Sequence, residues 1–227
     1  MGYWTSDPRV AVRSIRAARE LGLHNPLSLP VVVDPRAAIK VDKGARVELG
    51  GRLYLGVWAT NRKHHSPERA TRTGIGPPPS QRTTLYLRRE GRLITEDWAL
   101  MGPGTQIVIG PEAELRVGAK SYLSGNSQIL ASERVSIGSG CALAWDVTVM
   151  DSDSHSLSVG GEQRPQSGPV EIGNHVWIGA GVMILKGAKI GDGAVVAAGS
   201  LVTGEIPPKC LAAGRPAGVL KEDVDWQ

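Results

Sequence analysis

The chain has 227 residues and a net charge of +4, and 41% of its residues are hydrophobic, a composition typical of a soluble globular protein. Two cysteines, Cys141 and Cys210, exclude a disulfide-rich scaffold, and no apolar run approaches the about 18 residues that a membrane span needs. No signal-peptide core follows the first residue, so we expect a cytoplasmic protein. Phe is absent and Gly occurs 29 times, which favours a fold with many tight turns over a helical bundle.

The first predicted element is a short amphipathic helix. Asp7 and Pro8 form an N-cap and first-turn pair, and Gly22 is a typical stop. Between them, four arginines lie along one face, and apolar residues that include Val12 and Ile15 lie along another. We expect residues 1–30 to cap an open end of the domain that follows; a helix lying on a membrane surface is the alternative.

Charge is distributed unevenly along the chain. Residues 1–104 contain 17 Lys and Arg and 9 Asp and Glu, a net charge of +8, whereas residues 105–227 have a net charge of −4. The basic half is either a solvated face or a surface for an anionic partner, such as a nucleotide-sugar, a lipid-linked glycan or a membrane. No nucleic-acid-binding motif accompanies the charge, so we expect no nucleic-acid partner.

Six-residue repeats begin near Val41 and stop at a loop over residues 58–84, which is polar, basic and rich in proline. Loops of this length inside a compact domain are usually functional or disordered, and we interpret this one as a candidate acceptor-binding loop. Its adjacent histidines, His64 and His65, are typical of a solvated loop, so we predict no metal site there.

The repeats resume around Leu87, and their phase slips by two residues between Ile129 and Ile137. Such irregularities often mark functional sites. A second interruption covers residues 150–169, directly before the most regular repeats.

Branched aliphatic residues recur every six positions between Val170 and Ile206, and small or branched residues follow four positions after each. A period of six is neither helical nor that of a simple strand. Three such units close a triangular coil of 18 residues, and coils stack at a strand spacing of about 4.8 Å. The pattern predicts an all-β solenoid over residues 31–206, followed by a tail at residues 207–227. The hand of the coil does not follow from periodicity.

The run VWIGAGVMILKGAKIGDGAVVAAGSLVTGEIPP, followed by AAGRPAGVLKE, resembles the hexapeptide-repeat acyltransferases. Residues 105–222 look like the C-terminal half of the maltose/galactoside, xenobiotic and polysaccharide O-acetyltransferases. The resemblance implies a left-handed parallel β-helix, acetyl-CoA as the acyl donor, and a homotrimer whose active sites lie between two subunits.

The resemblance also places a catalytic histidine in the second interruption, where this chain has His155 after Asp151 and Asp153. Transfer of an acetyl group from a thioester to a hydroxyl needs a general base, and imidazole, with an ordinary pKa of about 6.5, is suited to it. A carboxylate or a carbonyl should orient the ring, and both aspartates are candidates. The alternative is a polar turn that carries a surface histidine.

Positions for the donor and the acceptor follow from the same resemblance. Trp177 matches a tryptophan beside the pantetheine arm of CoA, and small residues leave room for that arm. Gly204 and Gly218 replace basic residues of the family, so Lys209 and Arg215 are hypotheses for the missing charge. The predicted donor-binding residues are Trp177, Gly179, Ala180, Ala197, Ala198, Thr203, Lys209, Arg215 and Lys221; the predicted acceptor-binding residues are Asn126 and Trp145, the latter either stacking on a sugar ring or simply packed.

His175 lies in a repeat turn, as a surface or subunit-interface residue, and no closely spaced histidine pair like that of γ-class carbonic anhydrases occurs on the coils. We therefore expect no metal cofactor. The expected function is acetyl-CoA-dependent O-acetylation of a sugar, a polysaccharide precursor or a glycosylated metabolite. The alternatives are N-acylation of an aminosugar and a non-catalytic solenoid scaffold.

Overall fold

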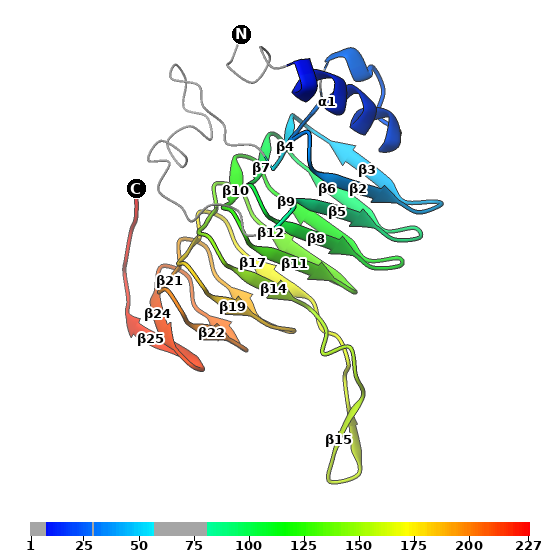
Figure 1. The fold of residues 1–227 in the computed structure, drawn as a ribbon. Coiled ribbons are helices and arrows are strands. Elements are labelled where there is room, and N and C mark those ends of the chain that lie inside the picture. The colour runs from blue at the N-terminus through cyan, green and yellow to red at the C-terminus, as the bar shows by residue number, and fades with distance from the viewer. Residues whose placement is uncertain (1–7, 29, 57–80) are drawn as a thin grey trace.

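The computed structural model describes residues 8–28, 30–56 and 81–227. Asp7, His64 and His65 lie outside the described residues, as does most of the first predicted loop. Figure 1 shows the strands stacked as rungs of a solenoid, with helix α1 (Pro8–Glu20) at one end. A short 3-10 helix, η2 (Pro26–Ser28), leads into the first coil.

Each coil gives one strand to each of three parallel sheets, in the order A, B, C. Sheet A contains β1 (Val31–Val33), β4 (Leu53–Leu55), β7 (Ala99–Met101), β10 (Ser121–Leu123), β13 (Ala142–Leu143), β18 (Trp177–Ile178), β21 (Val195–Val196), β24 (Leu211–Gly214) and the antiparallel β25 (Ala217–Lys221). Sheet B contains β2 (Ala38–Val41), β5 (Thr84–Leu87), β8 (Gln106–Ile109), β11 (Gln128–Ala131), β14 (Thr148–Met150), β19 (Met183–Ile184) and β22 (Leu201–Val202). Sheet C contains β3 (Arg46–Leu49), β6 (Arg92–Thr95), β9 (Glu114–Val117), β12 (Arg134–Ile137), β17 (Val170–Ile172), β20 (Lys189–Ile190) and β23 (Glu205–Ile206). The predicted all-β, left-handed parallel β-helix is confirmed.

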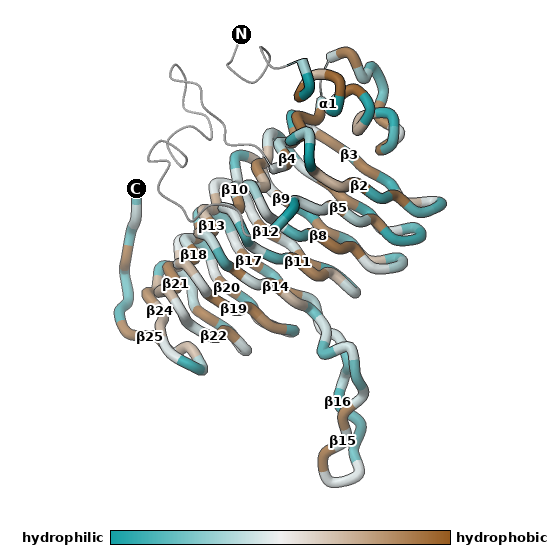
Figure 2. Tube along the Cα trace, in the orientation of Figure 1, coloured by the Kyte–Doolittle hydropathy of each residue, from teal (hydrophilic) through white to brown (hydrophobic). Residues whose placement is uncertain are grey.

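The inside of the solenoid is formed by the two predicted columns of each hexad. Ile178 and Ile184 are fully buried, and so are Val176 and Val182 from the second column. Ser200, the polar member of that column, donates a hydrogen bond from its hydroxyl to the carbonyl of Ala197 at 2.7 Å. Burial of each large aliphatic side chain contributes about 1.5–3 kcal/mol. In Figure 2, brown segments recur along the strands of successive coils.

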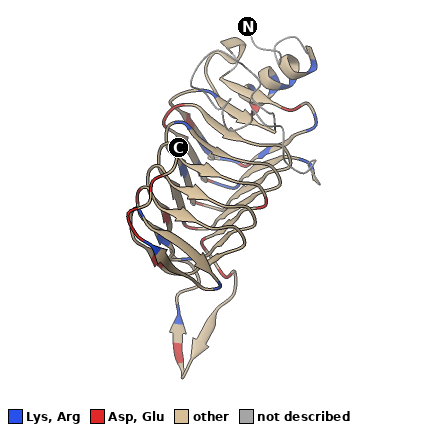
Figure 3. Cartoon of the chain, turned by 90° about the vertical axis from the view of Figure 1, so that its left-hand side faces the viewer, with Lys and Arg blue, Asp and Glu red and all other residues tan. Residues whose placement is uncertain are grey.

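The outer faces of the three sheets differ. Sheet C carries charged residues that pair between neighbouring strands, such as Arg134 with Glu171 at 3.0 Å. Sheets A and B instead present several apolar side chains outward, including Trp177 on sheet A and the half-buried Leu130 on sheet B, although Lys40 on sheet B is exposed. In Figure 3, where the side of β10, β21 and β24 faces the viewer, the strands are mostly tan. The outer face of sheet C is therefore suited to contact with solvent, and the outer faces of sheets A and B are suited to packing against another protein surface.

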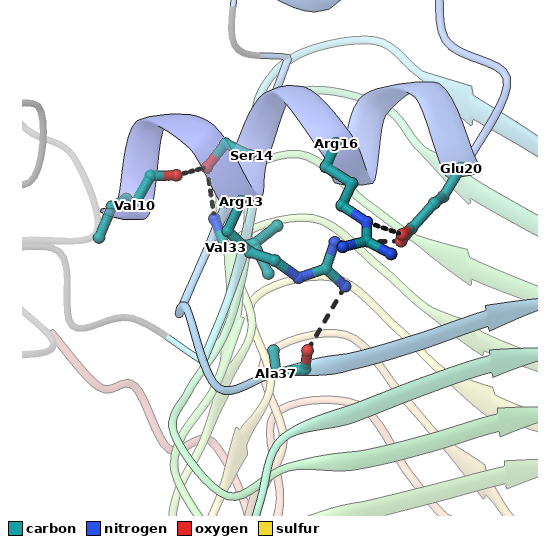
Figure 4. A network of polar contacts seen from close by, with 7 residues as sticks. All are labelled: Val10, Arg13, Ser14, Arg16, Glu20, Val33 and Ala37. Atoms are coloured by element: carbon teal, nitrogen blue, oxygen red, sulfur yellow. Dashed lines mark hydrogen bonds and ion pairs between the residues drawn. The ribbon is translucent and has the colours of Figure 1, made fainter. Parts of the chain in front are cut away.

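Helix α1 packs against β1 at the start of the solenoid. Its Ser14 hydroxyl donates to the carbonyl of Val10 at 2.7 Å and accepts the backbone N–H of Val33 at 3.0 Å (Figure 4). The predicted apolar face was wrong in part, because Val12 is 67% exposed. The buried stripe is small and partly polar, which brings the helix close to the strand; it consists of Val10, Ser14, Ala17, Ala18 and Leu21.

The second interruption is an antiparallel hairpin, formed by β15 (Leu157–Val159) and β16 (Glu162–Arg164). It projects from the stack between β14 and β17 (Figure 1). The first interruption is shorter than the predicted 58–84, since Thr83 is already buried and β5 begins at Thr84. The tail predicted from residue 207 contains two further strands of sheet A, because the buried Cys210 and Ala212 continue the inner column.

Neither described helix combines the length and the apolar character that crossing a bilayer requires. Both cysteines are free and buried, and burial raises the pKa of the Cys141 thiol.

Candidate active site

The turns that lead from sheet A to sheet B, here called the A/B corner, bring six of the predicted residues together along one edge of the solenoid. The backbone N–H of Gly181 donates to the carbonyl of Trp145 at 3.1 Å, and the N–H of Gly199 donates to that of Ala180 at 2.8 Å. These bonds stack the turns of successive coils directly on one another. The predicted acceptor and donor residues that share the A/B corner are Asn126, Trp145, Gly179, Ala180, Ala197 and Ala198, and Asn126 lies one position further along its turn than Trp145 does in the next coil.

The lower part of the A/B corner has small side chains because neighbouring coils approach closely there. A Cβ added at Gly179 would lie 2.5 Å from the backbone nitrogen of Ala198, so this position accepts only glycine. Trp145, 38% exposed, stands above this smooth surface. Arg215 closes it below, where its Nη1 donates to the carbonyl of Gly199 at 3.4 Å. The corner is an elongated surface with an aromatic ring above and a cation below.

A pocket of about 530 Å³ opens at the upper end of the same corner. Arg36 and Arg82 line it together with Thr83 and the backbone of Gly104, whose N–H donates to the Thr83 hydroxyl at 2.8 Å. Asp34 also lines the pocket and pairs with Arg36 at 3.3 Å, so the pocket keeps a positive balance from Arg82. No sequence motif indicated this pocket; the only signal was the basic character of the first half of the chain.

Four of the predicted donor residues lie outside the A/B corner of the same chain. Trp177 lies on the outer face of sheet A and is 45% exposed. Thr203 is exposed in the turn after β22, between sheets B and C, and Lys209 lies in the turn between sheets C and A. Lys221 lies in β25 opposite Leu211. Ala197, by contrast, is half-buried in the corner turn directly after β21.

A contact that the sequence did not reveal covers part of the Trp177 region. The ring of Trp226 stacks on the ring of His175, with centroids 4.4 Å apart and planes 8° apart. Its Nε1 donates to the His175 carbonyl at 2.8 Å, and its ring lies 6.2 Å from that of Trp177. His175 thus holds the end of the chain against the solenoid. The one sequence feature that could have indicated this contact is an apolar residue, Trp226, within a tail of charged residues.

His155 is exposed at the start of the hairpin, and its Nδ1 lies 3.3 Å from the backbone carbonyl of Asp153. Neither predicted carboxylate contacts the ring. The carboxylate of Asp153 pairs with Lys186 at 2.5 Å. Asp151 is fully buried and accepts the backbone N–H groups of Ser132 and Glu133 at 2.7 and 2.8 Å. The sequence left open whether a carboxylate or a carbonyl orients the ring of His155; the group in contact with the ring is a carbonyl.

The hairpin and the A/B corner lie at opposite edges of sheet B. Ala180 is in the A/B corner of one coil, and Lys186, which contacts the hairpin, is at the far end of the same coil's sheet B strand. Strand β19 lies between these two turns and holds them apart. His155 is therefore separated from the column in its own chain. Within the described ranges, no group of His, Cys, Asp and Glu is arranged to hold a metal ion.

Comparison with known proteins agrees with this architecture. Residues 169–204 match the family model described as bacterial transferase hexapeptide (six repeats). The galactoside O-acetyltransferase of Escherichia coli strain K12 is 39% identical over 116 residues, which are 50% of this chain and 56% of that protein. The chain thus spans little more than half the length of this relative.

Two solved structures share the fold over most of their length. The polysialic acid O-acetyltransferase OatWY has a TM-score of 0.56 at 21% identity and covers 84% of this chain and 90% of its own. The polySia-specific acetyltransferase NeuO has a TM-score of 0.53 at 20% identity, with coverages of 87% and 89%.

The fold and the corner turns define a left-handed β-helix protein built from hexapeptide repeats. Residues 169–204 match a hexapeptide-repeat family model, and half of the chain is similar to the galactoside enzyme, in agreement with the resemblance described from the sequence.

Proposed function

We propose that this protein is an acyltransferase that moves the acetyl group of acetyl-CoA to a hydroxyl of a sugar or glycan. The observation that carries the proposal is the column of Trp145, Ala180 and Ala198 at the A/B corner, with Asn126 in the turn above. It offers a smooth surface for an extended thioester arm beside an aromatic ring for a sugar. The resemblance to a galactoside O-acetyltransferase supports the same chemistry.

His155 is the proposed general base. With its Nδ1–H directed at the carbonyl of Asp153, its Nε2 is free to accept the hydroxyl proton while the oxygen attacks the thioester carbonyl. The carbon–sulfur bond then breaks, and the imidazolium returns the proton to the leaving thiolate. The products are an O-acetyl ester and free CoA.

The active site is proposed to form between subunits of a homotrimer. Two features support this: the hairpin leaves the edge of sheet B opposite the A/B corner, and sheets A and B present apolar faces while sheet C is charged. The hairpin of one subunit would then bring His155 to the A/B corner of the next. A cytoplasmic location is proposed together with acetyl-CoA as the donor.

The acceptor is proposed to carry a carboxylate or a phosphate. The support is the pocket above Asn126, where Arg36 and Arg82 face the same corner. Guanidinium groups are suited to such anions because they bind them through paired N–H donors.

Calorimetry with acetyl-CoA and CoA, followed by thiol release with neutral, anionic and amino-sugar acceptors, tests this proposal. We expect one donor site per chain, a mass three times 24.0 kDa, and turnover with hydroxyl acceptors. His155→Ala should keep donor binding and lose about 100-fold or more in turnover, whereas the control His24→Ala should resemble the parent. Absence of donor binding would favour the scaffold alternative, and turnover with amines alone would favour N-acylation.

Mixing subunits tests the shared site. Heterotrimers of His155→Ala with a Trp145→Ala variant should regain activity that neither parent has, because some interfaces then combine an intact histidine with an intact corner. Activity that never exceeds that of the separate variants would place both residues in one subunit's site.

A further inference from the structure

The base of the hairpin is tied to the solenoid from both sides. Lys186, in the coil below, places its Nζ 2.5 Å from the carboxylate of Asp153 and 2.6 Å from the carbonyl of Pro165. These two partners are on opposite legs of the hairpin. The ammonium group therefore crosslinks the legs to each other and to the coil. Its side chain is 26% exposed, so solvent screens these contacts only in part.

The coil above supplies a second set of ties. Ser132 and Glu133 form the turn between β11 and β12 where the repeat slips by two residues, and their N–H groups both donate to the Asp151 carboxylate. Ser167, on the returning leg, donates its hydroxyl to the Glu133 carboxylate at 2.7 Å. The two extra residues therefore provide the partners that hold both ends of the interruption.

We propose that Lys186 is a positioning residue for His155. Asp153 links the two: its side chain is held by Lys186, and its carbonyl contacts His155 Nδ1. A two-stranded hairpin is marginally stable on its own, so the position of a histidine at its start depends on these ties. Holding the Asp153 carboxylate at Lys186 also keeps it from the imidazole ring. The inference rests on the proposed role of His155 as the base.

The test compares Lys186→Met with Lys186→Arg and with Lys189→Met. Arginine can still donate to both the carboxylate and the carbonyl, and Lys189, one strand further on, pairs with Glu171 at 3.9 Å on sheet C, away from the hairpin. Amide hydrogen exchange over residues 152–166 should accelerate in Lys186→Met and stay as in the parent in the other two variants. This measurement needs no catalytic turnover.

Steady-state kinetics of thiol release provide the second measurement. We expect kcat to fall about 10- to 100-fold in Lys186→Met with the KM for acetyl-CoA within twofold of the parent, because a small displacement of a reacting group costs rate rather than donor binding. Lys186→Arg should recover most of the rate. In a His155→Ala background, Lys186→Met should cause no further loss, because the lysine acts through the histidine.

The outcomes separate the two proposals. Unchanged exchange and unchanged kcat in Lys186→Met would overturn the positioning role, and so would an equal loss of rate in the His155→Ala background. A fully active His155→Ala variant would instead overturn the assignment of the base and, with it, the positioning role, while the exchange data would still report whether Lys186 holds the hairpin.

Discussion

Replacing Asp151 by asparagine removes the charge that holds the turn between β11 and β12. The carboxylate is fully buried and accepts two backbone N–H groups, at 2.7 and 2.8 Å. The amide of asparagine retains one acceptor oxygen and presents its NH₂ group to the other N–H. One hydrogen bond to a charged acceptor is lost and two donors face each other, so we expect a cost of about 2–3 kcal/mol.

Equilibrium urea denaturation of Asp151→Asn beside Asp146→Asn measures this cost. Asp146 is exposed in the A/B corner, so its substitution should change the free energy of unfolding by less than about 0.5 kcal/mol. In a thermal scan, the Asp151 variant should melt roughly 4–12 °C lower, since 1 kcal/mol corresponds to about 2–4 °C in a chain of this size. Equal stability of the two variants would refute the assigned role of the buried carboxylate.

Three further predictions concern the solenoid itself. Ile184→Ala should destabilise the protein by about 2–5 kcal/mol in urea because Ile184 is fully buried, whereas Val12→Ala, at a position 67% exposed, should have almost no effect. Ser14→Ala should cost about 1–3 kcal/mol by leaving the buried N–H of Val33 unpaired, and a smaller loss would mean that water or a shift of α1 restores a partner. Burial raises the pKa of Cys141 in the folded protein, so its contribution to stability is complete below the unfolded pKa of about 8.5 and declines as pH rises toward the folded value. Cys141→Ala should therefore reduce the decline of the free energy of unfolding between about pH 8 and 10. An unchanged dependence on pH would contradict this assignment.

The parts of the fold that depend on short repeats could be predicted from the sequence. Ile172 and Ile190 pair with each other across neighbouring coils because every coil repeats the same inward position, and such positions show as a period of six. The interruption that contains the hairpin could be predicted for the complementary reason, since the repeat stops after Met150 and returns at Val170, but its two strands were not predicted.

The contacts that join distant coils could not be predicted. Asp151 lies two residues before Asp153, yet its partners Ser132 and Glu133 are in the preceding coil, so spacing near His155 held no information on where the carboxylate points. The stacking of Trp226 on His175 joins residues 51 positions apart. In α1, Ser14 was not expected in the buried stripe because its hydroxyl is polar, although its two backbone partners make burial favourable.

The stacked turns of the A/B corner convert position in the chain into height along the solenoid axis. Each coil adds one strand spacing, so the three steps from Asn126 to Ala198 correspond to about 14 Å. The number of coils along this edge therefore sets the length of the ligand that it can bind. Because each coil contacts only its neighbours, inserting or deleting one coil of 18 residues would lengthen or shorten this edge without disturbing the remaining coils. The fold can therefore adjust the separation between its two binding regions in fixed increments.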